Sequence, residues 1–273
     1  DAIRALLGRK QRGEIERVVV AGWSMGAAVA WSLIARHGLD RIAGLVVVDM
    51  SPRPLNDAEW RLGLRDGLGL EGSERVAAAM PAHWPVFTER IVASLFAEGA
   101  APDPALAAWA RTEIARNDPA AMAAMWRSLV AQDFRSALPR IDRPTLIACG
   151  ARSALYAPEV FAWQAARMPR ARVLAFEHSG HAPHLTEPAA FNAALAEFLR
   201  GGRPTPRVQP VKRAASPAQQ AESGGCAHQH DQGDGGRVPQ GDEQRGIVDA
   251  VGRIERCGQR ARKQSRGSPG RRR

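Results

Sequence analysis

The sequence predicts an α/β protein in which parallel strands alternate with helices and a block of helices interrupts the sheet. Three observations carry this prediction. A β-branched run, a helical segment and a second apolar run follow one another within about 35 residues. No strand pattern then appears between residues 52 and 139. Beyond that block, two more strand-like runs occur, with helical segments between and after them.

The first unit is a strand, a helix and a second strand. Residues 15–21 (IERVVVA) predict a buried strand that ends at Gly22. Residues 25–37 have Ala and Leu at helical spacing and stop at Gly38, a residue type that commonly ends helices. Residues 41–49 (RIAGLVVVD) predict the second strand. Because a strand–helix–strand unit of this length connects parallel neighbours, we expect a parallel sheet with right-handed crossovers.

The rest of the folded part is a helical block followed by the remaining strands. The block predicts helices at residues 56–68, 73–80, 86–98, 104–116 and 118–132. The last of these begins with Asp118-Pro119, an N-cap followed by proline at the first helical position. A strand, a helix, a strand and a helix then follow, at residues 143–150, 158–168, 171–176 and 188–200.

Composition divides the chain near residue 200. Residues 201–273 contain no Leu, Phe, Trp, Tyr or Met. A segment without large apolar side chains cannot build a packed core, so we predict a disordered tail. The tail has 15 Lys and Arg against 7 Asp and Glu, which accounts for most of the chain's net charge of +10. We therefore do not expect nucleic acid as a partner of the folded part, and the tail is either a solvated segment or an electrostatic tether.

The spacing of the cysteines and the hydropathy of the chain indicate in which cellular compartment the protein is expected. Cys149, Cys226 and Cys257 are widely spaced and include no Cys-x-x-Cys pair. This pattern argues against a disulfide framework or a zinc ribbon and favours a reducing environment. No run reaches the ~18–20 apolar residues of a membrane span, and no signal peptide is recognisable. We therefore expect a cytoplasmic protein that does not bind a membrane.

Gly22-Trp23-Ser24-Met25-Gly26 is a Gly-x-Ser-x-Gly motif at the junction of a predicted strand and a predicted helix. At such a junction a sharp turn exposes the serine hydroxyl, and small residues on both sides let the neighbouring elements approach. The helix N-terminus stabilises developing negative charge, and the N–H of Met25 is the candidate oxyanion donor. The motif predicts that Ser24 is a nucleophile; the alternative is an ordinary glycine-rich turn.

A serine hydroxyl needs a base, which is usually a histidine. Residues 177–184 (EHSGHAPH) follow the last predicted strand, so His178, His181 and His184 are expected at the carboxyl end of the sheet. Three histidines at spacing three could also bind a metal, but the loop lacks the cysteines and clustered acids typical of zinc sites. We therefore expect neither a metal nor a cofactor.

The segments GWSMG, LVVVDMSPRP, TLIACG and SGHAPHLTEP together resemble the α/β-hydrolase family, in particular its carboxylesterase-like branch. The resemblance covers residues 1 to about 200. It implies the C-terminal half of a parallel α/β-hydrolase sheet in residues 1–52 and 139–200, with a helical cap at residues 53–138 inserted between strands. It also implies that Ser24 is the nucleophile and His181 the base of an enzyme that hydrolyses small-molecule carboxylic esters.

The acid of the triad is where the sequence departs from the family. The family usually has Asp a few residues after the penultimate strand, and here Ser153 occupies that position. Some members place the acid after the strand that follows the elbow, a position that Asp49 matches. The alternatives are that Asp49 caps the loop at Ser51, or that the site is a Ser-His dyad. If Asp49 is the acid, Asp49→Asn lowers turnover at least ~100-fold, whereas Ser153→Ala changes it little.

Tryptophans supply the candidate substrate contacts. We expect Trp23, Trp84 and Trp126 to contact an apolar acyl group; the alternative is that the tryptophans of the cap form the cap's own core. A serine nucleophile favours acyl transfer to water. The alternatives are a lactonase or a cofactor-free perhydrolase of the same fold, and a non-catalytic binding protein from another functional class.

The resemblance also implies strands that this sequence does not contain. The family's elbow follows the fifth strand, whereas the elbow strand here begins near residue 15. The absent part would supply the second oxyanion donor and a strand that pairs with the elbow strand. We therefore expect the parent protein to be a hydrolase and the 273-residue chain, taken alone, to be inactive or unstable.

Overall fold

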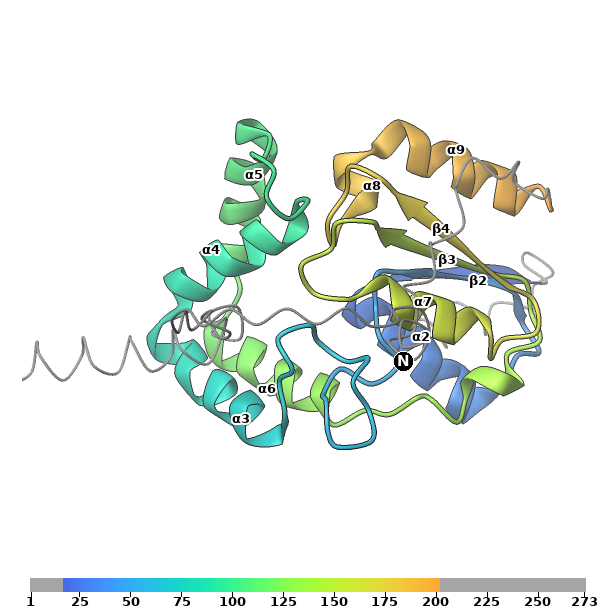
Figure 1. Cartoon of the computed structure of the whole chain (residues 1–273), viewed down its shortest axis with the longest axis horizontal. Helices are drawn as coiled ribbons and strands as arrows, with labels where there is room; N and C mark the ends of the chain where they lie inside the picture. Colours follow the sequence, from blue (N-terminus) through green and yellow to red (C-terminus); the bar gives the residue numbers. More distant parts are fainter. Residues whose placement is uncertain (1–16, 202–273) are drawn as a thin grey trace, which may run out of the picture.

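The computed structural model describes residues 17–201, which form a parallel sheet with helices on both faces (Figure 1). The strands, in the spatial order β1-β2-β3-β4, are β1 (Val18–Trp23), β2 (Ile42–Val48), β3 (Thr145–Gly150) and β4 (Ala171–Phe176). All three strand pairings are parallel, so the predicted sheet is confirmed. The register pairs Trp23 with Val48 and Val48 with Ala148, which brings the carboxyl ends of three strands together.

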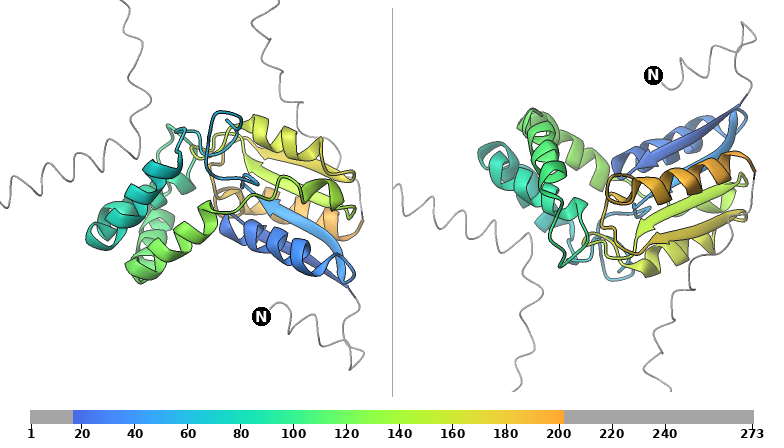
Figure 2. Two further views of the ribbon diagram at one scale, coloured as in Figure 1. Left: turned by 90° about the horizontal axis from the view of Figure 1, so that it is seen from below. Right: turned by 90° about the horizontal axis from the view of Figure 1, so that it is seen from above.

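Two layers of helices enclose the sheet. Helices α2 (Met25–His37) and α7 (Pro158–Ala165) cover one face, and α9 (Pro188–Leu199) covers the other (Figure 2). In β2, Leu45 and Val47 face the first layer, while Val46 and Val48 belong to the cluster under α9. A strand that is apolar on both faces is typical of the centre of a parallel sheet, which explains the continuous run of apolar residues in β2.

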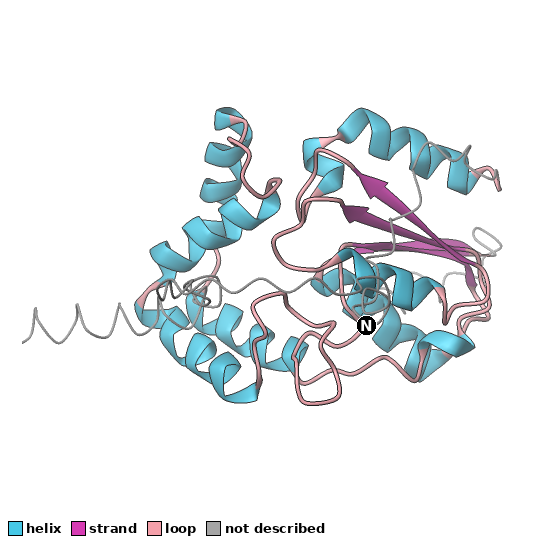
Figure 3. Ribbon diagram, in the orientation of Figure 1, coloured by secondary structure: helices cyan, strands magenta, loops and turns pink. Residues whose placement is uncertain are grey.

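A helical cap lies between β2 and β3 along the chain. Its helices are α3 (Leu70–Ala79), α4 (Trp84–Leu95), α5 (Pro104–Ala115) and α6 (Pro119–Val130). The arrowheads of the strands point toward the cap, so the cap stands at the carboxyl edge of the sheet (Figure 3). The predicted start of α6 is confirmed, because the Asp118 carboxylate accepts a hydrogen bond from the N–H of Ala121 at 2.9 Å.

The helix predicted at residues 56–68 is wrong, because this segment forms turns. The Asn56 side chain donates to the carbonyl of Leu64 at 2.7 Å. The Asp57 carboxylate accepts from the N–H of Trp60 at 2.8 Å. Short polar side chains that bond to nearby backbone groups compete with helical hydrogen bonds, and here they hold the chain in turns.

Several sequence predictions fall on residues that the structure does not describe. These are the tail at 202–273, with Cys226 and Cys257, and the segment before residue 17. Cys149 is buried in β3. Within residues 17–201, no helix combines the length and the apolar composition that a membrane span requires.

Candidate active site

Ser24 lies in a strained turn between β1 and α2. Its backbone has a φ of 52° and a ψ of −124°, and its N–H donates to the carbonyl of Val48 at 2.9 Å. A Cβ on Gly22 would lie only 2.4 Å from the backbone of Gly26, so the strand and the helix approach each other as only glycine allows. Met25 is the first residue of α2. The chain thus forms a sharp strand-to-helix turn at the motif, held by the neighbouring strand.

Asp49 follows β2 and is completely buried, with a φ of 46°. Its Oδ2 lies 2.7 Å from Nδ1 of His181 and accepts a hydrogen bond from Oγ of Ser153 at 2.8 Å. Its Oδ1 accepts from the N–H of Gly150 at 3.2 Å. The structure therefore brings together Asp49, the predicted acid, and Ser153, which occupies the family's usual acid position, and the carboxylate of Asp49 lies beside His181.

The loop serine considered as a partner for Asp49 has other contacts. Oγ of Ser51 donates to the carbonyls of Arg53 at 2.8 Å and Leu62 at 2.9 Å. These bonds hold the turns that replace the predicted helix. The hydrogen bonds of the Asp49 carboxylate, by contrast, run to the last residue of β3 and to the loops that follow β3 and β4.

His181 lies in the loop after β4 and is 4% exposed. Its backbone N–H donates to the carbonyl of Ser94, and the N–H of Ala182 donates to that of Leu95, both at 3.2 Å. Ser94 and Leu95 are the last residues of α4, whose final carbonyls have no partner within the helix. The end of a cap helix therefore holds the backbone of this loop.

Glu187 closes the same loop from its other end. Its carboxylate accepts from the N–H of His178 at 3.0 Å and from the hydroxyl of Ser179, which in turn accepts from Thr186 at 2.7 Å. Sequence reasoning missed Glu187, because no catalytic pattern requires a carboxylate six residues after His181. No local signal marked it, because Ser179 and Glu187 are eight positions apart and only the folded loop brings them together.

Trp23 joins the turn of Ser24 to the loop of His181. Its indole N–H donates to the backbone carbonyl of His181 at 2.7 Å, and its side chain is 36% exposed. The sequence predicted a substrate contact at this position. The hydrogen bond is an additional role that the pattern of the motif does not indicate.

The three loop histidines have different surroundings. His181 faces Asp49, whereas the ring of His184 lies 4.7 Å from that of Trp23 and 5.8 Å from that of Phe191. Burial lowers the pKa of His184 below its usual value. In the described part of the chain, no three His, Cys, Asp or Glu side chains gather as a metal site would need.

The two other predicted substrate contacts lie inside the cap. Trp84 is buried in a cluster with Met80 and Phe87. Trp126 packs against the same cluster, and its indole N–H donates to the Ser73 hydroxyl at 3.0 Å. Both side chains therefore contribute to the cap's own core, and their contact with a substrate stays a prediction.

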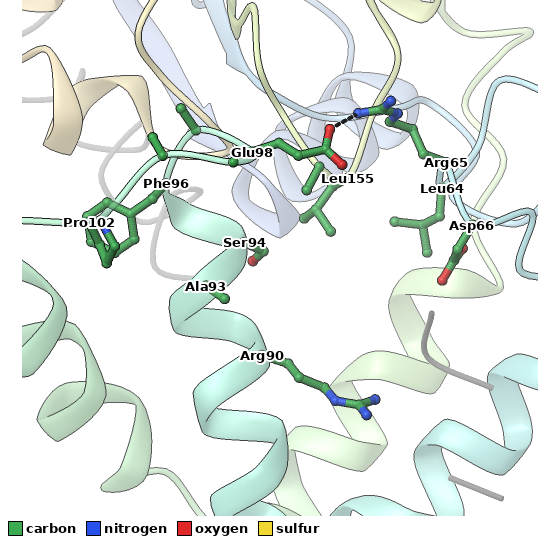
Figure 4. Close-up of a pocket in the computed structure, with 14 residues that line it drawn as sticks. Leu64, Arg65, Asp66, Arg90, Ala93, Ser94, Phe96, Glu98, Pro102 and Leu155 are labelled. Atoms are coloured by element: carbon green, nitrogen blue, oxygen red, sulfur yellow. Dashed lines mark hydrogen bonds and ion pairs between the residues drawn. The ribbon is translucent and has the colours of Figure 1, made fainter. Parts of the chain in front are cut away.

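A hollow of about 580 Å³ lies between α4 and the loops that follow β2 and β3 (Figure 4). Ser94, whose carbonyl holds His181, is part of its wall, so the hollow adjoins the His181 loop. Five polar side chains lie in the wall, Arg65, Asp66, Arg90, Ser94 and Glu98. Arg65 and Glu98 pair with each other at 2.8 Å, and burial raises the pKa of Asp66. Much of the remaining wall is apolar, with Leu64, Ala93, Phe96, Ala97, Pro102 and Leu155.

Comparison with known proteins agrees with this architecture. The model of the Alpha/beta hydrolase family matches residues 1–194. The pimeloyl-[acyl-carrier protein] methyl ester esterase of Aromatoleum aromaticum is 34% identical over 195 residues, which are 67% of this chain and 74% of that protein.

Solved structures show the same fold. A bromoperoxidase from Bacillus anthracis aligns with a TM-score of 0.65 at 22% identity, over 72% of this chain and 71% of its own. A thermophilic esterase from Thermogutta terrifontis aligns with a TM-score of 0.58 at 26% identity, over 68% of this chain and 65% of its own.

Proposed function

Because the chain belongs to the α/β-hydrolase family, we propose that it is a serine hydrolase that cleaves carboxylic esters through an acyl-enzyme. Ser24 is the nucleophile, His181 the base and Asp49 the acid of this proposal. The observation that carries it is the buried contact of 2.7 Å between His181 Nδ1 and Asp49 Oδ2. The loop that makes this contact is itself bonded to the residue before Ser24.

The carboxylate decides which nitrogen of His181 carries the proton. An ionised carboxylate can only accept hydrogen bonds, so Asp49 favours the tautomer with the proton on Nδ1. The lone pair on Nε2 then takes the proton of Ser24 as its Oγ attacks the ester carbonyl. The imidazolium returns this proton to the leaving alcohol. A water molecule, deprotonated by Nε2, then releases the carboxylic acid and restores the Ser24 hydroxyl.

The start of α2 supplies the electrostatic part of the proposal. The tetrahedral intermediate places negative charge on the former carbonyl oxygen. The N–H of Met25 is the first of a 13-residue helix, whose N-terminus carries partial positive charge. A backbone donor at this place stabilises the oxyanion, and removing one such donor costs about 10²–10³ in rate in known enzymes.

The hollow beside the His181 loop supports an ester with an apolar acyl chain as the substrate class. Its largely apolar wall suits the acyl chain of an ester, and the Aromatoleum relative is named for the methyl ester of a pimeloyl group on acyl-carrier protein. Ala93 lines the hollow, so Ala93→Trp should lower kcat/KM at least tenfold for octanoate esters and little for acetate esters. Ala108→Trp, on an exposed position of α5, is the matched control.

A fluorophosphonate probe tests the reaction class directly. If the chain melts cooperatively, it should be labelled at Ser24 and hydrolyse p-nitrophenyl butyrate, and Ser24→Ala should lose both activities. That result would overturn the expectation that the chain taken alone is inactive or unstable. Ser136→Ala, at an exposed position, should behave as the unchanged protein. A folded chain that is not labelled at Ser24 would instead favour a non-catalytic binding protein.

A further inference from the structure

The residue before the nucleophile makes a contact that its place in the motif does not predict. The indole N–H of Trp23 donates to the backbone carbonyl of His181 at 2.7 Å, across 158 positions of the chain. The Trp23 ring also packs against the His181 ring, at 5.5 Å between centroids, and meets His184 edge-on at 4.7 Å. The side chain thus spans from the Ser24 turn to the His181 loop.

Both ends of this contact are rigid. Trp23 is the last residue of β1 and pairs with Val48, and the N–H of Ser24 donates to the same residue of β2. On the other side, His181 is held by Asp49 through its ring and by Ser94 through its backbone. A hydrogen bond between two segments that are each held by other bonds fixes the distance between them, because neither segment can shift without breaking those bonds.

We infer that Trp23 is a positioning residue, whose indole N–H sets the distance between the Ser24 hydroxyl and the imidazole of His181. This inference rests on the proposed function. The proton transfer between Ser24 and His181 occurs only when the two groups are in hydrogen-bond reach, and small displacements in such a pair lower the rate strongly. The bond acts on the backbone of the base, so it influences the chemical step whatever ester is bound.

The inference separates two roles for the same side chain. If Trp23 only contacts the substrate, its replacement changes KM, and the change differs between esters. If Trp23 positions His181, loss of the N–H lowers kcat by a similar factor for every ester and leaves KM nearly unchanged. We expect a fall of about tenfold, since a neutral hydrogen bond contributes modestly and Asp49 and Ser94 still hold the loop.

Two substitutions remove the donor while keeping an aromatic side chain. Trp23→Phe retains an aromatic face for His184. Replacement of Trp23 by 3-benzothienylalanine retains both rings and exchanges only the N–H for sulfur, so packing is preserved even if the phenylalanine variant folds poorly. Trp109→Phe, at an exposed position of α5, is the matched control and should leave kcat unchanged.

The measurements are kcat and KM for acetate, butyrate and octanoate p-nitrophenyl esters, and the rate of fluorophosphonate labelling at Ser24. A uniform fall in kcat with a parallel fall in the labelling rate supports the inference. Unchanged kcat in the benzothienylalanine protein, or a change confined to KM, overturns it. Ser24→Ala is measured alongside. If that variant still hydrolyses esters, the proposed function itself has failed. If it loses the activity, the proposed function stands, and the Trp23 variants alone decide the inference.

Discussion

Replacing Asp49 with Asn keeps the shape of the side chain but leaves one acceptor oxygen where there were two. In the native protein, one oxygen accepts from Gly150 N–H at 3.2 Å, and the other faces Ser153 Oγ at 2.8 Å and His181 Nδ1 at 2.7 Å. The amide has two orientations. The first keeps its oxygen on Gly150 and turns the NH₂ group toward His181.

In that orientation His181 must accept at Nδ1, so its proton moves to Nε2 and the ring can no longer take the proton of Ser24. The second orientation keeps the productive tautomer but sets the NH₂ group against Gly150 N–H. Asp49 is completely buried, and a buried donor without an acceptor costs about 1–3 kcal/mol. The unproductive tautomer should therefore exceed the productive one by about thirtyfold.

The lost negative charge adds to this effect, because nothing then stabilises the imidazolium that forms during attack. We expect kcat to fall by about 10³–10⁴ with KM nearly unchanged. The assay is hydrolysis of p-nitrophenyl butyrate, with thermal unfolding as the check on the fold. A folded Asp49→Asn protein whose kcat stays within tenfold of the original would refute the assignment of Asp49 and favour a Ser-His dyad.

The remaining predictions concern the support of the site and the fold. Ser153→Ala removes a donor to Asp49, so we expect kcat to fall about tenfold, more than the sequence prediction of little change; equal activity in a steady-state assay would contradict this. Gly22→Ala would place a Cβ 2.4 Å from the backbone of Gly26 and should lower the free energy of unfolding by about 3 kcal/mol, whereas Gly26→Ala, which meets open space, should not destabilise in the same urea titration. Burial lowers the pKa of His184, so the unfolded chain binds this proton more readily than the folded one. The contribution of His184 to the free energy of unfolding is therefore present above its usual pKa and lost as the pH falls below it. Between pH 7.5 and pH 5.5, urea titrations should show a smaller loss of unfolding free energy for His184→Phe than for the unchanged protein. An equal loss in the two proteins would contradict the reasoning.

Local sequence patterns were sufficient for the order of the elements. Residues within a few positions of one another specify the β-branched strands, the helix that starts after Ser24 and the N-cap of α6 at Asp118. The helix predicted at residues 56–68 failed for an equally local reason, since Asn56 and Asp57 bond to backbone groups that a helix would need.

The sequence favoured Asp49 as the acid, because Ser153 carries no charge, but local patterns could not show that the two side chains meet beside His181. The two residues are 104 positions apart and each follows an apolar strand, so either could face the His181 loop. The pairing of β2 with β3 places them side by side, and the contact with His181 Nδ1 then falls to Asp49. The sequence also could not predict what surrounds Trp84 and Trp126, because a helical pattern does not show which neighbour a helix face will pack against.

Periodicity and capping residues thus determined which segments are strands and helices, and they put Ser24 and His181 at strand ends. Which side chains meet was decided by strand order and register, since contacts between residues more than a hundred positions apart depend on how the strands pair and not on any local preference.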